Sequence, residues 1–190
     1  PQGAAQFRAL GRAVGVADSR MQAITDALTD WLDADTTPLP LGAEDGAYAG
    51  LATPYRTGGV MLAEVSELRA VKGVDAGTYR RLRPWVCALP TSRLSPLNVN
   101  TLTPEQAPLL TMLTGGALTP ERAKAVIAAR PRSGWSDTGA FWSQSALSTL
   151  RIDPEARDQI TVLTRFFDLR VDVELGGSHA VRTALLEAGS

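Results

Sequence analysis

Two residue types that serve many active and metal sites are almost absent from this 190-residue sequence, which has one cysteine, Cys87, and one histidine, His179. A single cysteine forms no internal disulfide, and one residue of each type cannot supply a zinc site. No serine or cysteine motif accompanies His179, so a nucleophilic catalytic set is not expected. We expect Cys87 to be a small core residue and His179 to be a structural or exposed residue of a strand.

Long apolar runs and a charge imbalance are also absent. No apolar run is long enough to cross a bilayer, and the glycine pairs at 58–59 and 115–116 lack the lysine and the strand context of a phosphate-binding loop. The net charge of −1 argues against a dedicated nucleic-acid binder, because phosphate contacts dominate such affinity. The remaining composition, 44% hydrophobic and 21% charged, is that of a globular protein with one or two domains.

What the sequence does contain is a concentration of carboxylates before Tyr48. Its members are Asp26, Asp30, Asp33, Asp35, Glu44 and Asp45. The first three recur at helical spacing on one face of a helix that ends near Asp33, and the others follow in a Pro- and Gly-containing loop. Because like charges repel, and because negative charge at a helix C-terminus opposes the helix dipole, this group needs a cation, wide solvation or arginine partners.

The spacing of these carboxylates favours a cation. If Asp33 is position 1, Asp35 and Glu44 occupy ligand positions 3 and 12 of an EF-hand loop. Thr37 occupies position 5, but Pro38 stands where that loop requires glycine, so the loop is not an EF-hand. It is still an oxygen-rich loop that closes on a helix end and is suited to Ca²⁺. The competing interpretation is a solvated acidic turn.

Helical periodicity covers most of the first 160 residues. Helices are expected over residues 5–14, 18–33, 63–71, 76–86, 104–114, 120–130 and 139–149, with a single turn after an N-cap at Asp153. Asp18 is expected to be the N-cap of the second helix. Gly73 followed by Asp75 indicates a helix-hairpin-helix turn. Thr103 and Thr119, each followed by proline, begin the two helices of a second helix-turn-helix.

The segment 34–60 is rich in Pro, Gly and Thr and is too long for an ordinary connection; such loops are usually functional, ligand-bound or disordered. Tyr48, Leu51 and Tyr55 supply apolar anchors, which favours a loop tied to the body of the protein. Trp135 and Trp142 are placed to line a site, but we interpret them as packing residues of a short helix.

After residue 160 the period changes from helical to two-residue. Apolar and charged residues alternate over 165–175, Gly176-Gly177 has the composition of a two-residue turn, and 178–187 is the return strand. We therefore predict a half-buried β-hairpin. Because a two-stranded hairpin is marginal alone, it needs further strands or must lie on the helices.

Basic residues flank both helical hairpins. They are Lys72, Arg80, Arg81 and Arg83 beside the first, and Arg122, Lys124, Arg130 and Arg132 beside the second. Helix-hairpin-helix units often bind the DNA backbone, so a nucleic-acid-binding module is the alternative function. The slightly acidic balance favours instead solvated arginines or partners for the acidic loop.

Short motifs follow one another in a fixed order between residues 18 and 130. They are D-W-L-D-A-D (30–35), G-A-E-D (42–45) with Tyr48, P-Y-R (54–56), S-E-L-R-x-V-x-G-V (66–74), Y-x-R-L-x-P-x-V (79–86), L-P (89–90) and N-V-N-T (98–101). No single motif is very specific, but their order and spacing, together with the terminal hairpin, resemble the minor pseudopilin K (GspK-type) family of type II secretion systems.

This resemblance implies a non-enzymatic α+β protein. A mostly helical domain with helix-hairpin-helix (SAM-like) repeats is inserted in the antiparallel sheet of a type IV pilin-like fold. Residues 1–160 would be the inserted domain, with a calcium-binding loop at 30–48, and 161–190 would be the C-terminal β-hairpin of the pilin-like sheet. The resemblance supplies Ca²⁺ as the ion, and the candidate ligands are Asp30, Asp33, Asp35, Glu44 and Asp45.

The resemblance also implies a location and partners. Members of the family cap the tip of the periplasmic pseudopilus with the I and J minor pseudopilins, joined by H, and serve protein secretion across the outer membrane; a secreted substrate or the secretin is a further expected partner. A single N-terminal helix anchors them in the bacterial inner membrane. That helix and the first part of the sheet do not precede Pro1, so we expect a fragment whose only membrane contact would be through the missing helix.

Overall fold

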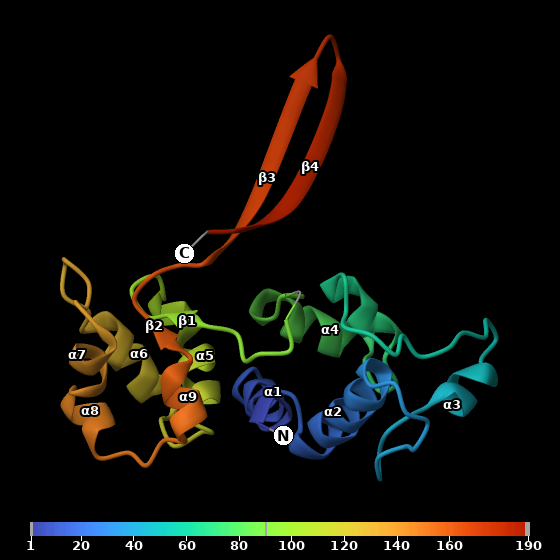
Figure 1. Cartoon of the computed structure of the whole chain (residues 1–190), viewed down its shortest axis with the longest axis horizontal. Coiled ribbons are helices and arrows are strands. Elements are labelled where there is room, and N and C mark those ends of the chain that lie inside the picture. The colour runs from blue at the N-terminus through green and yellow to red at the C-terminus, as the bar shows by residue number, and fades with distance from the viewer. Residues whose placement is uncertain (1, 90, 189–190) are drawn as a thin grey trace.

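The computed structural model describes residues 2–89 and 91–188 and shows a mixed helix-and-strand protein (Figure 1). The α-helices are α1 (Gln2–Ala13), α2 (Asp18–Leu32), α3 (Asp45–Ala49), α4 (Ala76–Leu82), α5 (Ala107–Leu113), α6 (Pro120–Ala128), α7 (Thr138–Trp142), α8 (Ser145–Ser148) and α9 (Pro154–Asp158). The 3-10 helices are η1 (Val65–Ala70), η2 (Arg83–Trp85) and η3 (Pro104–Gln106). The strands are β1 (Leu97–Asn98), β2 (Ile160–Thr161), β3 (Phe166–Leu175) and β4 (Ser178–Glu187).

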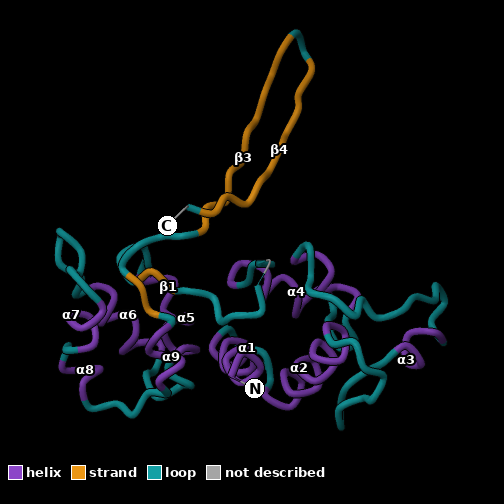
Figure 2. Tube along the Cα trace, in the orientation of Figure 1, coloured by secondary structure: helices purple, strands orange, loops and turns teal. Residues whose placement is uncertain are grey.

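These elements form two lobes and a projection. The first lobe, residues 2–89, and the second lobe, residues 97–162, lie side by side, and the β3–β4 hairpin extends away from both (Figures 1 and 2). Each lobe has its own buried apolar residues. The mixed α+β class expected from the sequence is therefore confirmed.

The first lobe is built around α1 and α2, which pack against each other. Gly15, at a φ of +82°, reverses the chain after α1, and Met21 and Ile24 of α2 are fully buried. The prediction that Asp18 is the N-cap of α2 is wrong, because Asp18 is the first residue of the helix. Its carboxylate accepts a hydrogen bond from Arg12 at 2.8 Å, since the turn brings α1 guanidinium groups within reach.

The turn predicted before α4 is confirmed. Gly73 has a φ of +89°, and Asp75 is the N-cap of α4, where its carboxylate accepts the Thr78 N–H at 2.7 Å. The preceding helix is shorter than expected: it is the 3-10 helix η1, which begins with a capping box between Glu64 and Glu67.

The second lobe contains the largest hydrophobic cluster. Its fully buried members are Val99, Leu110, Leu118, Ala123, Phe141 and Leu147. Trp135 and Trp142 pack edge-on against a phenyl ring of this cluster, with centroids 5.1 Å apart in each case, so their packing role is confirmed. The predicted capping box of Thr103 with Gln106, and the Thr119 N-cap, are also confirmed.

The single helix predicted over 139–149 is wrong. The chain forms α7 and α8, separated by Ser143 and by Gln144, whose backbone is extended (φ −57°, ψ 137°). Phe141 and Leu147 are both fully buried. On one continuous helix they would point about 120° apart, so the break allows both side chains to enter the same core.

A short parallel pairing of β1 with β2 was not predicted. The Leu97 N–H donates to the Gln159 carbonyl at 2.7 Å, and the Val99 N–H donates to the Thr161 carbonyl at 3.0 Å. Two residues per strand give no periodicity to recognise, and the partners lie far apart in the sequence. This pairing joins the beginning and the end of the second lobe.

The two lobes meet where α1 packs on α5. Across this junction the side-chain amides of Gln6 and Gln159 exchange hydrogen bonds, and each residue is 6% exposed. Gln159 also donates to the Ser95 carbonyl at 3.1 Å. The contact between the lobes thus includes two buried polar side chains that hydrogen-bond to each other.

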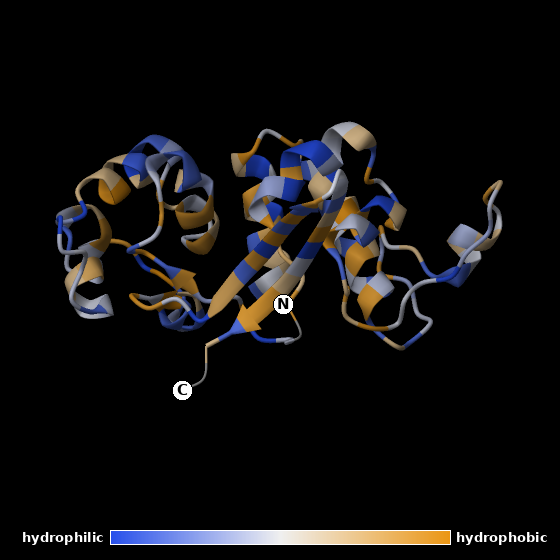
Figure 3. Cartoon of the chain, turned by 90° about the horizontal axis from the view of Figure 1, so that it is seen from above, coloured by the Kyte–Doolittle hydropathy of each residue, from blue (hydrophilic) through white to orange (hydrophobic). Residues whose placement is uncertain are grey.

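The predicted strands and turn of the terminal hairpin are confirmed. The antiparallel ladder runs from the pair Phe166–Glu187 to the pair Leu175–Ser178. Apolar and charged residues alternate along β3 (Figure 3), whereas β4 contains three consecutive apolar residues, Ala184, Leu185 and Leu186. The prediction of a half-buried hairpin is wrong for the described chain, because Val173 on the apolar face is 52% exposed and no described element covers it.

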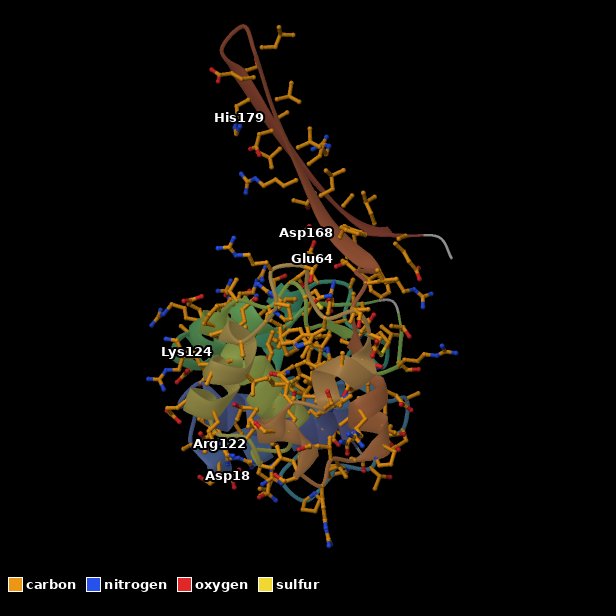
Figure 4. All side chains as sticks on the ribbon, turned by 90° about the vertical axis from the view of Figure 1, so that its left-hand side faces the viewer. Asp18, Glu64, Arg122, Lys124, Asp168 and His179 are labelled. Atoms are coloured by element: carbon orange, nitrogen blue, oxygen red, sulfur yellow. The ribbon has the colours of Figure 1, made fainter. Side chains whose placement is uncertain are left out.

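Several single-residue predictions are also decided. Cys87 is exposed rather than a core residue, and Leu51 is 45% exposed rather than an anchor. His179 is exposed on β4, as expected, and lies far from the helices (Figure 4). Asp153 caps α9 through the Glu155 N–H at 2.9 Å. Among the described residues, no helix is long and apolar enough to span a membrane.

Candidate metal centre

Three of the predicted carboxylates come together beside the C-terminal end of α2. One oxygen from each of Asp33, Asp35 and Glu44 lies within 4.8 Å of the others. Asp33 is the C-cap of α2, and Glu44 is the N-cap residue of α3. These are the EF-hand positions 1, 3 and 12 of the sequence, and they converge although the loop does not have EF-hand composition.

The three clustered carboxylates have an unfavourable electrostatic environment. Oδ1 of Asp33 and Oε1 of Glu44 are inaccessible to solvent and have no hydrogen-bond partner among the described residues. Burial, and then the charges of Asp35 and Asp30, raise the pKa of the Asp33 carboxyl. Burial and the neighbouring carboxylates likewise raise the pKa of Glu44. A bound cation would relieve both the lack of partners and the repulsion.

The other two predicted ligands lie next to this group but contact backbone amides. Oδ2 of Asp30 accepts the Ala43 N–H at 2.7 Å. Oδ1 of Asp45 accepts both the N–H and the hydroxyl of Thr57 at 2.9 Å, and these bonds lower the pKa of Asp45. Neither contact was predicted, because each joins residues 12 or 13 positions apart.

Aromatic residues fix the loop to the rest of the first lobe. Tyr48 is 2% exposed and packs edge-on to Trp31, with centroids 5.4 Å apart. The Tyr48 hydroxyl accepts the Lys72 N–H at 3.2 Å, and the Tyr55 hydroxyl donates to the Ala70 carbonyl at 2.9 Å. Two of the three predicted anchors, Tyr48 and Tyr55, therefore tie the loop to the segment before α4.

The donor set of Asp33, Asp35 and Glu44 fits a hard divalent cation. It offers carboxylate oxygens and no nitrogen or sulfur, which suits Ca²⁺ better than zinc or copper. Arg56 approaches the neighbouring Asp45 at 3.9 Å, but no arginine of the described chain forms an ion pair with the three clustered carboxylates. The expected arginine partners for the acidic loop are thus limited to this one weak, exposed contact.

Two of the basic residues of the helical hairpins bind the backbone of the chain itself. Arg81 donates to the Gly15 carbonyl, and Arg130 donates to the Leu102 carbonyl at 2.7 Å. Arg122 and Lys124 extend from the surface of α6 (Figure 4). Because two of these arginines bind carbonyl groups of the chain itself and the net charge is −1, the nucleic-acid alternative is not favoured.

Comparisons with known proteins agree on one family. Two models described as "Type II secretion system (T2SS), protein K" match residues 1–91 and 97–162, which correspond to the two lobes. Type II secretion system protein K of Pectobacterium carotovorum is 40% identical over 98% of this chain and 56% of its own length. The protein of the same name from Klebsiella pneumoniae is 39% identical over 98% of this chain and 57% of its own.

A solved structure extends the likeness to three dimensions. A chain of the GspK–GspI–GspJ complex from enterotoxigenic Escherichia coli superposes with a TM-score of 0.85 at 31% identity, covering 100% of this chain and 66% of that chain. The present chain thus spans somewhat more than half the length of the curated relatives it matches. The two family models together cover nearly all of both lobes, and so this chain belongs to the type II secretion system protein K family.

Proposed function

We propose that this chain is the periplasmic part of a minor pseudopilin that caps the tip of the type II secretion pseudopilus, without enzymatic activity. The observation that carries the proposal is the superposition of the whole chain, hairpin included, on a chain of the GspK–GspI–GspJ complex. A cap works by shape: the helical lobes make the subunit bulky, so that further subunits can add only beneath it.

We infer that the β3–β4 hairpin is part of a larger pilin-like antiparallel sheet into which the helical lobes are inserted. Its two strands pair over ten residues each, yet Phe167, Leu169 and Val173 on one face are 42–52% exposed. A two-stranded ribbon with a bare apolar face is marginally stable in water. Neighbouring strands and a helix packed on that face would remove the exposure.

The partners that we propose are the I and J minor pseudopilins, with H joining them; a secreted protein or the secretin would face the exposed side of the lobes. The supporting observation is the composition of the solved complex that the chain resembles. The corresponding location is the periplasm, with a single-pass anchor in the bacterial inner membrane.

A binding experiment tests this assignment. The full-length periplasmic region should form a ternary complex with the periplasmic regions of the I and J proteins, measured by size-exclusion chromatography with light scattering. Leu169→Asp, on the apolar face of the hairpin, should abolish the complex, whereas Thr183→Asp on the opposite face should retain it. Failure of the unmodified protein to bind the I–J pair would reject the assignment.

We also propose that Asp33, Asp35 and Glu44 hold one Ca²⁺ ion in the acidic loop. Their convergence, the two oxygens without partners and the raised pKa values support this. When bound, the ion supplies positive charge that ties the α2 end to the start of α3. Because only the folded loop gathers the three carboxylates, binding contributes directly to the stability of the first lobe.

Calorimetric titration and thermal melting test the calcium proposal. The protein should bind Ca²⁺ and melt at a higher temperature with calcium than with excess chelator. Glu44→Gln should weaken calcium affinity by about tenfold or more, because charge count sets the affinity of such sites. Glu121→Gln on α6 is the matched control and should change nothing. Identical melting midpoints with calcium and with chelator would remove the proposal.

A further inference from the structure

The carboxylate of Asp30 has surroundings unlike those of the other acidic residues in the loop. Asp30 is 1% exposed, on the last turn of α2. Its Oδ2 accepts the Ala43 N–H at 2.7 Å, and both of its oxygens lie 3.2 Å from the Leu39 nitrogen. A buried carboxylate is thus paired with the backbone of a segment that begins nine residues later in the chain.

The backbone around Asp30 leaves little free space. Gly42 lies directly against the carboxylate, and a Cβ added at this position would come 1.9 Å from Oδ2 of Asp30. Since no side chain larger than hydrogen fits there without movement of the carboxylate, Gly42 allows the loop to approach Asp30 closely. The same approach closes that side of the carboxylate to a ligand.

The contacts of Asp30 determine where Glu44 lies. The Ala43 N–H donates one short charge-assisted hydrogen bond to the Asp30 carboxylate, and Glu44 is the next residue. Asp33 and Asp35 come shortly after Asp30, at the end of α2. Because the contacts of Asp30 hold the loop against α2, the loop brings Glu44 next to these two residues. Apart from the contacts of Asp30, one hydrogen bond joins the segment 39–43 to α2 among the described residues: the Leu41 N–H donates to Asp26 at 3.3 Å.

We propose that Asp30 is a positioning residue that folds the acidic loop onto α2, and that it is not a ligand of the ion. The effect of Asp30 on calcium binding rests on the proposed calcium site, whereas the anchoring of the loop does not require calcium. Asp45 also pairs with backbone, but within the long loop and at a more exposed position: its carboxylate accepts the N–H and hydroxyl of Thr57, and its side chain is 47% exposed.

Hydrogen exchange in the presence of chelator tests the anchor separately from calcium. In Asp30→Asn, an amide group replaces one accepting oxygen and the charge is lost, so the Leu39 and Ala43 amides should exchange about tenfold faster or more than in the unmodified protein. Asp18→Asn, at the other end of the same helix where the side chain contacts Arg12, is the matched control and should leave both amides unchanged. Gly42→Ala, which retains every carboxylate, should reproduce the effect of Asp30→Asn.

Calcium titration of the same variants separates positioning from ligation. Asp30→Asn and Gly42→Ala should both weaken calcium binding and both accelerate exchange. Asp35→Asn should weaken binding with no change in exchange at Leu39 and Ala43. If Asp30→Asn weakens calcium binding while the two amides keep their exchange rates, Asp30 is a ligand and the proposal is overturned.

The unmodified protein distinguishes this proposal from the calcium proposal. If it binds no calcium but Asp30→Asn and Gly42→Ala still accelerate exchange at the two amides, the calcium function fails and the anchor stands. Circular dichroism shows whether the helices of each variant are retained. If Asp30→Asn unfolds the lobe, Gly42→Ala decides the question: unchanged exchange at Leu39 and Ala43 in that variant would overturn the proposal.

Discussion

The two lobes of this protein are stabilised in different ways. The first lobe has two small apolar clusters, around Trp31 and around Met21, and depends on carboxylates and tyrosines that contact distant backbone. The second lobe has one large apolar cluster that includes residues from Val99 to Ile160. The first lobe should therefore respond to charge, ions and pH, and the second should respond mainly to changes in side-chain volume.

The largest effect should come from a cavity in the second lobe. Phe141 is fully buried between Trp135 and Trp142, so Phe141→Ala should cost about 3–5 kcal/mol of unfolding free energy. Denaturant unfolding followed by circular dichroism measures this loss, which should be the same with calcium and with chelator. Phe167→Ala, on the exposed hairpin, is the control for the loss of an aromatic ring. A Phe141→Ala cost below about 1 kcal/mol would contradict the proposed contrast between the lobes.

The junction of the lobes is expected to have an intermediate effect. Gln6→Leu removes the donor to Oε1 of Gln159, and a buried acceptor left without a donor costs about 1–3 kcal/mol. Replacing both glutamines by leucine should cost less than the sum of the two single changes. Denaturant unfolding of the three variants measures the coupling. Strictly additive costs would show that the pair does not couple the lobes.

The calcium binding proposed for the first lobe should depend on pH. The raised pKa values of Asp33 and Glu44 mean that protons compete with the ion as pH falls, so calcium affinity should decrease from pH 7 toward pH 5. In chelator the sign is opposite: a raised carboxyl pKa favours the folded state at low pH, and this contribution is lost as pH rises through the folded pKa. Titrations and melts at several pH values measure both trends, and a calcium affinity independent of pH would contradict the prediction.

The smallest effects should come from equivalent helix caps in the two lobes. Asp75 and Asp137 each accept a backbone N–H in the first turn of their helix, at 2.7 Å and 2.8 Å. Replacing either by alanine should lower Tm by about 2–4 °C. The Thr78 N–H lowers the pKa of Asp75 to about 2, so its contribution should persist above pH 4 and be lost as pH falls toward 2. Equal losses at pH 7 would show that local capping is independent of how each lobe is stabilised.

The local elements of both lobes could be predicted from the sequence, because their signals lie within a few residues. Thr103, Thr119, Asp75 and Asp153 precede their helices as caps, and Gly176-Gly177 joins the hairpin strands. The division of 139–149 into two helices could not be predicted, because it follows from where the core of the second lobe lies.

The candidate site was predicted in part. Spacing identified Asp33, Asp35 and Glu44, and the structure brings these three together. The same spacing included Asp30 and Asp45, whose carboxylates contact Ala43 and Thr57 backbone groups instead. Sequence could not separate the carboxylates that cluster from those that pair with backbone groups, because the side chains of both sets are chemically identical.

The sequence by itself determined most helices and caps, the terminal hairpin and the order of motifs that marks the family, since each depends on neighbours along the chain. Only the tertiary structure decided which carboxylates face one another, that Cys87 is exposed, and that β1 pairs with β2. These features depend on contacts between residues far apart in the chain. Such contacts form only when packing brings separate elements together, and no local pattern encodes the distance between them.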